Sequence, residues 1–217
     1  MEFGELASLI KSRRSIRRWQ DREVDPDQLV RAVELATWAP NGGNRQNWRF
    51  YVIMNRDTIK SIARAVQASA VEMSLWPEAQ AFGPEVVGWS QRAAFFRSAP
   101  AAVAVAVEQY QSMADKIVTA RGVPDPRANQ MRSWRNAANS RIQSVSSAIA
   151  YLLLILHQMG LGAVWMTGPM QVKGEIEKIL GIPQKMDLVA FIPVGYPAES
   201  PDPGGRRPVD EVIEIVK

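Results

Sequence analysis

The chain has 217 residues, of which 26 are Lys or Arg and 22 are Asp or Glu, so its formal net charge is +4. This length favours a single domain, covering residues 1–217, with a sizeable core. Hydrophobic residues make up 47% and charged residues 22%, which is ordinary for a globular protein and excludes a disordered one. The mild positive charge is compatible with an anionic ligand and is too weak to indicate nucleic acid unless it is clustered.

Two scarce residue types exclude several kinds of chemistry. The chain has no cysteine, which excludes disulfides, zinc–thiolate sites, iron–sulfur clusters and thiol nucleophiles. His157 is the only histidine, which excludes a multi-histidine metal site, and its place on an apolar helix indicates a structural role. If the protein is an enzyme, a cofactor must therefore carry its reaction.

Hydropathy indicates no membrane segment and no secretory signal. The N-terminal residues lack an apolar core of signal-peptide length, and the longest apolar run, 148–156, is too short to cross a bilayer. We therefore expect a cytoplasmic protein that does not act in a membrane.

Helices and strands alternate through the first half of the chain. In order, the pattern predicts a helix at 2–12, a helix at 25–38, a loop at 40–44, a strand at 48–54, a helix from 57, and a strand at 101–107. Asp25 followed by Pro26 is a good helix start, and we expect Asp57 to cap the next helix. Residues 70–98 form an aromatic-rich excursion from the sheet.

The second half continues the alternation after another excursion, at 108–140. In order, the pattern predicts a long helix at 136–159, a strand at 163–166, a helix at 172–180 and a strand at 188–194. The two excursions are packed helices, an oligomer interface or a substrate lid. Strands that alternate with helices indicate an α+β domain in which helices cover a sheet.

A basic turn follows the first helix. Five of the eight residues from Lys11 to Arg18 are basic. The turn is a solvated charged surface, a nucleic acid patch or a phosphate clamp. Ser15 favours the clamp, because a hydroxyl and a neighbouring backbone N–H complement a phosphate oxygen. Nucleic acid ranks lowest, since Trp19 is the only aromatic residue near enough to stack on a base.

Four segments in order resemble the nitroreductase family of flavoproteins. They read RRSIRRW, WAPNGGNRQNWRF, GLGAVWMTG and VGYP followed by GGRRPV, and they span about Ile10 to Val209. The resemblance implies a three-layer sandwich with a central mixed sheet of four to five strands, an interlocked homodimer and bound FMN. Asn41 stands where the family commonly has serine, and Asn47 replaces a proline, but neither change removes a side chain that the cofactor needs.

The same resemblance implies which residues contact the flavin. Those expected to hold the phosphate and ribityl chain are Arg13, Arg14, Ser15 and Arg17, with Arg206 or Arg207 as a further phosphate contact. Those expected to reach the flavin of the partner subunit are Pro40, Asn41, Gly42, Asn44 and Gln46. Those expected to run beside the ring are Trp165, Met166, Thr167 and Gly168, where the backbone N–H groups of Thr167 and Gly168 would face the reactive nitrogen and the adjacent carbonyl.

The activity implied is hydride transfer from NADH or NADPH to FMN, followed by reduction of a nitroaromatic, quinone or similar acceptor in a ping-pong sequence. No G-x-G-x-x-G follows a strand, so the nicotinamide would not bind through a Rossmann site. Alternatives are a dehalogenating or flavin-destroying branch of the family, or an FMN-binding module without turnover. Glu108, Tyr110 and Lys116 lie in an excursion, but their spacing does not match the substrate lid of the dehalogenating branch.

Overall fold

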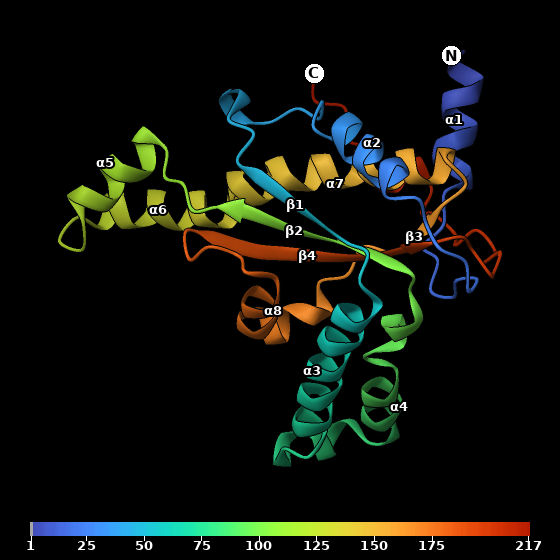
Figure 1. Cartoon of the computed structure of the whole chain (residues 1–217). Coiled ribbons are helices and arrows are strands. Elements are labelled where there is room, and N and C mark those ends of the chain that lie inside the picture. Colours follow the sequence, from blue (N-terminus) through green and yellow to red (C-terminus); the bar gives the residue numbers. More distant parts are fainter. Residues whose placement is uncertain (1) are drawn as a thin grey trace.

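The computed structural model describes residues 2–217 and has a four-stranded sheet at its centre (Figure 1). The strands are β1 (Trp48–Ile53), β2 (Ala101–Glu108), β3 (Gly162–Ala163) and β4 (Met186–Gly195), in the order β1-β2-β4-β3. Every pair of these strands is antiparallel, and the parallel pairing found within residues 2–217 is an isolated bridge between Ser15 and Ala163. The prediction of an α+β fold with four to five strands is confirmed, but apart from that bridge the sheet is antiparallel and not mixed.

Strand β2 shows why the sheet is covered on both faces. Residues 101–107 alternate between alanine and valine after the first position, and all seven are buried. Side chains of a strand point to opposite faces in turn. The even-numbered alanines therefore pack into one core cluster and the odd-numbered valines into the other. A strand with two apolar faces requires a layer of helices on each side.

Helices supply both outer layers (Figure 1). Their bounds are α1 Phe3–Ser12, α2 Pro26–Ala36, α3 Arg56–Ser74, α4 Pro84–Arg92, α5 Met113–Arg121, α6 Pro126–Ala138, α7 Ser140–Gln158 and α8 Lys173–Leu180. Helices α2 and α7 cover the valine face, where Leu29 and Leu152 are fully buried. Helices α3 and α8 cover the alanine face through Ile62 and Ile176. The result is the three-layer arrangement that the family resemblance implies.

Several predicted boundaries were wrong in detail. Asn55, not Asp57, caps α3, because its side chain accepts hydrogen bonds from the N–H groups of Asp57 and Thr58. The long helix begins at Ser140 rather than at 136, since Asn139 adopts a left-handed φ of 40° and separates α6 from α7. The strand predicted at 163–166 is β3 followed by an isolated bridge between Met166 and Phe191.

Both excursions are helical. The first holds the end of α3, the whole of α4 and two short 3-10 helices at Pro77–Phe82 and Phe95–Ser98. The second holds α5 and α6, here called the α5–α6 arm, which extends beyond one end of the sheet (Figure 1). Helix α1 lies at the opposite end, and none of its residues is buried. No helix within residues 2–217 has the length and apolar character needed to cross a membrane.

Candidate functional site

The basic turn (Arg13–Arg17) is fixed against strand β3. The backbone N–H of Ile16 donates to the carbonyl of Ala163 at 3.1 Å, next to the parallel bridge of Ser15. The indole N–H of Trp19 donates to the carbonyl of Gly162 at 2.9 Å. A Cβ on Gly162 would lie 2.7 Å from Cγ1 of Ile16, so only glycine lets the turn come this close. Close packing against Ile16 therefore explains the second glycine of the GLG segment.

Gly195, in the GYP segment, has a similar role. A Cβ there would lie 2.6 Å from the ring of Pro100 and 2.9 Å from the indole of Trp19. Beyond it, the N–H groups of Arg17 and Arg18 both donate to the carboxylate of Glu199. Three segments that are far apart in sequence thus meet around the basic turn.

Three guanidinium groups gather at this turn, here called the arginine cluster (Arg13, Arg14 and Arg206). Burial, and then the nearby charges of Arg14 and Arg206, lower the pKa of Arg13. None of the three forms an ion pair with any residue from 2 to 217. Like charges held together without a counter-charge are unfavourable, and an anion would relieve the repulsion.

Of the two late arginines expected as alternatives, Arg206 is the one whose charge acts on Arg13. Arg207 is exposed, and the charges that act on Arg13 do not include it. Arg206 is therefore the member of this pair that the fold brings to the turn.

His157 joins the end of α7 to the end of α1. Its Nε2 lies 2.9 Å from Oγ of Ser12. Burial, followed by the charges of Arg13 and Arg14, lowers the pKa of His157 below its usual value. The ring thus borders the arginine cluster.

The 165–168 segment leaves β3 and presents free backbone donors. Met166 exchanges two backbone hydrogen bonds of 3.0 Å with Phe191, which fixes the segment to β4. Thr167 and Gly168 follow at the start of a 3-10 helix, Gly168–Val172, and both are exposed. The first N–H groups of a helix have no partner within it, so these two are available to a ligand. Trp165, a core candidate by residue type, is 36% exposed.

One cavity of about 480 Å³ joins the basic turn to this segment. Arg17 and Arg18 line it together with Met166 and Gly168, so two of the sequence-predicted groups meet in a single chain. The rest of its wall comes largely from α3 and the first excursion, as Val66, Trp89, Arg92, Ala93 and Phe95, with Gln171. Sequence reasoning did not single out these wall residues, and the aromatic richness of residues 70–98 was the signal that pointed toward them.

The loop at 40–46 lies at the other end of α7. Oγ of Ser147 donates to the carbonyl of Pro40 at 2.7 Å, and the N–H of Gly42 donates to Oγ of Ser144 at 3.2 Å. Ser144 and His157 are thirteen residues apart on one helix, which corresponds to about 20 Å at 1.5 Å per residue. Within one chain the loop is therefore remote from the arginine cluster.

The shape of this loop is fixed locally. The N–H of Gln46 donates to Oδ1 of Asn41 at 3.0 Å, and Nε2 of Gln46 donates to Oδ1 of Asn44 at 3.2 Å. Asn44 and Gln46 have φ values of 50° and 48°, which are unusual for residues other than glycine. Backbone strain of this kind often accompanies a binding role.

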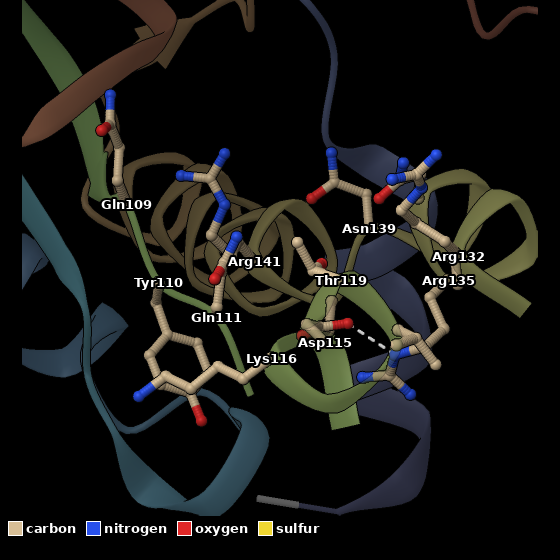
Figure 2. A pocket seen from close by; sticks show the side chains of 14 residues that line it. Gln109, Tyr110, Gln111, Asp115, Lys116, Thr119, Arg132, Arg135, Asn139 and Arg141 are labelled. Atoms are coloured by element: carbon tan, nitrogen blue, oxygen red, sulfur yellow. Dashed lines mark hydrogen bonds and ion pairs between the residues drawn. The ribbon is translucent and has the colours of Figure 1, made fainter. Parts of the chain in front are cut away.

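A larger cavity of about 910 Å³ lies between the α5–α6 arm and the start of α7 (Figure 2). Its wall includes Tyr110, Lys116, Arg132 and Arg141 (Figure 2). Tyr110 and Arg141 also line a smaller hollow beside Gly42, so the cavity adjoins the 40–46 loop and not the basic turn. None of the sequence-predicted site residues lines it.

The charges of this larger cavity are partly neutralised within the chain. Arg135 pairs with Asp115 at 2.5 Å, as the dashed line in Figure 2 marks, and Arg141 pairs with Asp187 at 3.1 Å. Glu108, at the edge of the same region, pairs with Lys185 at 3.6 Å. Tyr110 and Lys116 line the cavity, whereas Glu108 does not.

The sequence matches the model of the nitroreductase family over residues 10–196. An iodotyrosine deiodinase of Thermotoga neapolitana is 28% identical over 211 residues, which cover 96% of this chain and 95% of that protein. An NADH dehydrogenase of Thermus thermophilus is 28% identical over 214 residues, which cover 93% of this chain and 91% of that protein.

Two solved structures share the fold. A BluB-like flavoprotein of Clostridium difficile superposes with a TM-score of 0.85 over the whole of both chains at 24% identity. An iodotyrosine deiodinase bound to FMN and 3-iodo-L-tyrosine superposes with a TM-score of 0.70 over 98% of this chain and 97% of the other, also at 24% identity. The family match extends from Ile10, just before the basic turn, to Tyr196 in the GYP segment, and the chain belongs to the nitroreductase family.

Proposed function

We propose that the protein is an FMN-dependent oxidoreductase that passes electrons from NADH or NADPH to a nitroaromatic, a quinone or a similar acceptor. The observation that carries the proposal is the basic turn: its arginine cluster forms no ion pair with any residue from 2 to 217, and its Arg17 lines a cavity together with Met166 and Gly168. Structures of the fold family include one with bound FMN, and curated relatives include an NADH dehydrogenase.

The residues present suit the phosphate end of FMN. A phosphate monoester is close to a dianion at neutral pH, and guanidinium groups bind it through two parallel hydrogen bonds. Arg13, Arg14 and Arg206 would supply that charge, with Ser15 and Arg17 beside them. Such charged hydrogen bonds contribute about 1.5 to 3 kcal/mol each, which is enough for a cofactor that stays bound.

The residues around the ring position suit redox chemistry without a side-chain nucleophile. The free N–H groups of Thr167 and Gly168 are donors that stabilise negative charge on a bound ring. The cavity wall consists of apolar side chains, arginines and one glutamine, with no carboxylate and no histidine. When bound, FMN would accept a hydride from the nicotinamide and deliver electrons to an acceptor that binds in its place. The protein's role is therefore to bind and orient the cofactor and the acceptor and to exclude water from them.

The same proposal includes a homodimer with FMN at the interface. The loop at 40–46 lies about 20 Å along α7 from the arginine cluster, so one chain presents two halves of a site that do not meet. Exposed apolar side chains mark surfaces that a second copy would cover. They lie on α1, on the α5–α6 arm and on the C-terminal tail, as Phe3, Ile10, Met113, Ile117, Trp134, Val209, Ile213 and Val216.

An absorbance spectrum and an anaerobic assay test the proposal. The purified protein should be yellow with about one FMN per chain, and it should oxidise NADH or NADPH faster when a nitro compound or quinone is added. Size-exclusion chromatography should give a dimer. A protein that takes up no FMN, or that binds FMN tightly as a monomer, would contradict the corresponding part of the proposal.

Dehalogenation is the second candidate. It is favoured by the deiodinase of Thermotoga neapolitana, which matches this chain almost from end to end. Against it, the spacing of Glu108, Tyr110 and Lys116 does not match the lid of that branch, and Glu108 pairs with Lys185 and does not line the cavity that the other two line. Release of iodide from 3-iodotyrosine by the reduced protein, at a rate above that of nitro reduction, would favour this candidate over the first.

A further inference from the structure

The cavity of about 480 Å³ beside Met166 and Gly168 has a wall that the family motifs do not provide. Trp89 and Arg92 come from α4, and Phe95 follows in the next 3-10 helix. These residues belong to the excursion at 70–98. Gly168, one of the two donors expected at the flavin ring, also lines the cavity, so this wall borders the space where a ligand would bind against the ring.

The aromatic part of the wall is held firmly from behind. The ring of Phe95 stacks on Trp19, with the ring centroids 6.3 Å apart and the planes 10° apart. Trp19 is buried and donates its indole N–H to the carbonyl of Gly162. Phe95 also meets Phe96 edge to face at 6.1 Å. A flat ligand therefore finds a flat, preorganised surface beside the 165–168 segment.

Arg92 adds a positive charge that no protein group neutralises. It forms no ion pair with any residue from 2 to 217, whereas Arg18, also on the cavity wall, lies 3.5 Å from the carboxylate of Glu199. The position of Arg92 is also accommodated by its neighbour. Gly88, one helical turn earlier, has no side chain, and a Cβ there would lie 3.2 Å from Nη1 of Arg92.

We propose that Arg92 makes this protein selective for planar aromatic electron acceptors that carry a negative charge, such as aromatic carboxylates. Trp89 and Phe95 take the ring, and the guanidinium of Arg92 takes the carboxylate. The inference rests on the function proposed above, because it concerns the acceptor that the same site reduces. Arg17 is expected to contact the cofactor, so Arg92 is the cation that can bind the negative charge of the acceptor.

The test compares two nitro compounds that differ in charge and have nearly the same shape, 4-nitrobenzoate and 4-nitrobenzamide. Because the two differ in reactivity, each variant is judged by its ratio to the wild-type flavoprotein for the same compound. Arg92→Gln should raise KM for nitrobenzoate about tenfold and that for nitrobenzamide by less than about twofold. Arg92→Lys should recover much of the loss, and nitrobenzoate reduction should weaken with added salt.

Two controls keep the result specific. Arg64→Gln removes an exposed arginine of α3 whose side chain donates to Ser61 and lies outside this cavity. This variant should leave KM unchanged for both nitro compounds. Calorimetry with benzoate and benzamide, which are not reduced, should show that Arg92→Gln weakens only benzoate binding to the oxidised flavoprotein. FMN content should be the same in every variant.

The outcomes separate the two proposals. A protein that binds no FMN and reduces neither compound overturns the proposed function and this inference together. A flavoprotein that reduces both compounds, but in which Arg92→Gln affects both equally or neither, overturns this inference alone. A rise in KM for NADH or NADPH without a change for nitrobenzoate also overturns it, since Arg92 would then serve the electron donor.

Discussion

The two ends of helix α7 carry opposite kinds of charge arrangement. At the His157 end, Arg13, Arg14 and Arg206 lie together and form no ion pair with any residue from 2 to 217; burial, and then the charges of Arg14 and Arg206, lower the pKa of Arg13. At the Ser140 end, Arg141 pairs with Asp187 and Arg135 pairs with Asp115. Among residues 2–217, the arginine cluster at the first end has no ion-pair partner, and an anionic ligand would supply one. The second end uses its carboxylates to hold the fold.

The two ends also differ in how the backbone is held. The basic turn pairs directly with β3, so its geometry depends on the sheet. The α5–α6 arm depends on caps and ion pairs among its own residues, such as the capping box of Ser112 and Asp115. One end thus has a charged turn that is anchored to the sheet, and the other has an arm that is stabilised by its own caps and ion pairs. Four measurements test this contrast.

The largest effect is expected where the turn meets the sheet. Gly162→Ala places a Cβ within 2.8 Å of the backbone-proximal atoms of Ile16 and should destabilise the protein by about 1 to 3 kcal/mol. Gly174→Ala, on α8 where nothing lies within 4 Å, should stabilise it by about 0.5 to 1 kcal/mol. Urea unfolding measures both. If both variants changed the free energy of unfolding by the same amount, the close contact at Gly162 would not matter for stability.

The next effect concerns the arginine cluster. Arg13→Gln should weaken FMN binding about tenfold to a hundredfold, because a charged hydrogen bond contributes about 1.5 to 3 kcal/mol. Turnover per bound FMN should change little, since the residue anchors the phosphate end. Flavin fluorescence titration measures the affinity.

The matched control for the cluster lies at the other end of α7. Arg135→Gln breaks the pair with Asp115 and should reduce stability while leaving FMN affinity within about twofold. If the two variants weakened FMN binding equally, the contrast between an anion site and structural ion pairs would be wrong.

A smaller effect is expected from His157. Burial, and then Arg13 and Arg14, lower its pKa, so the unfolded chain takes up a proton before the folded one does. The stability that this difference contributes is present above the unfolded value of about 6.5 and is lost as pH falls below it. Between pH 7.5 and 5.5, the Tm of the cofactor-free wild-type protein should therefore fall by more than the Tm of the His157→Gln variant.

Inorganic phosphate provides the check on that explanation. Phosphate at the arginine cluster would offset the positive charges and reduce the loss at pH 5.5. If Tm depended on pH in the same way for the wild type and His157→Gln, with and without phosphate, the charges of the cluster would not affect the histidine.

Sequence reasoning predicted the fold, and it singled out two segments that the fold brings together, for identifiable reasons. The alternating Ala-Val strand at 101–107, the Asp25-Pro26 helix start and the basic turn are local patterns with strong physical preferences. Arg13 and Met166 belong to segments whose order in the chain is itself informative. The structure places both groups at the same end of the sheet.

The rest depended on long-range packing that no local pattern encodes. The break at Asn139 was missed because the residues on both sides of it favour a helix. Trp89, Arg92 and Phe95 were not identified as wall residues, since their position follows from how α4 folds back along α3. The remoteness of the 40–46 loop became visible only with the length and orientation of α7.

The smallest effect should appear in the α5–α6 arm under acid. Hydrogen bonds from Arg135 and then Ser112 hold the pKa of Asp115 well below its usual range, against an opposing contribution from burial. A depressed carboxylate pKa gives stability that is present above the unfolded value of about 3.9 and is lost as pH falls toward the folded value. Asp115→Asn should therefore be less stable than the wild type at pH 6, and the difference should narrow steadily below pH 4.

High salt should reduce the difference in stability between the wild type and Asp115→Asn at pH 6, because the ion pair of Asp115 and Arg135 is partly exposed and salt screens it. Phosphate, in contrast, should stabilise the basic turn at the same pH. Unfolding followed by circular dichroism in chloride and in phosphate at equal ionic strength measures both responses. If phosphate and chloride acted alike on the wild type and on Arg13→Gln, the cluster would be an ordinary charged surface, and the two ends of α7 would not differ in kind.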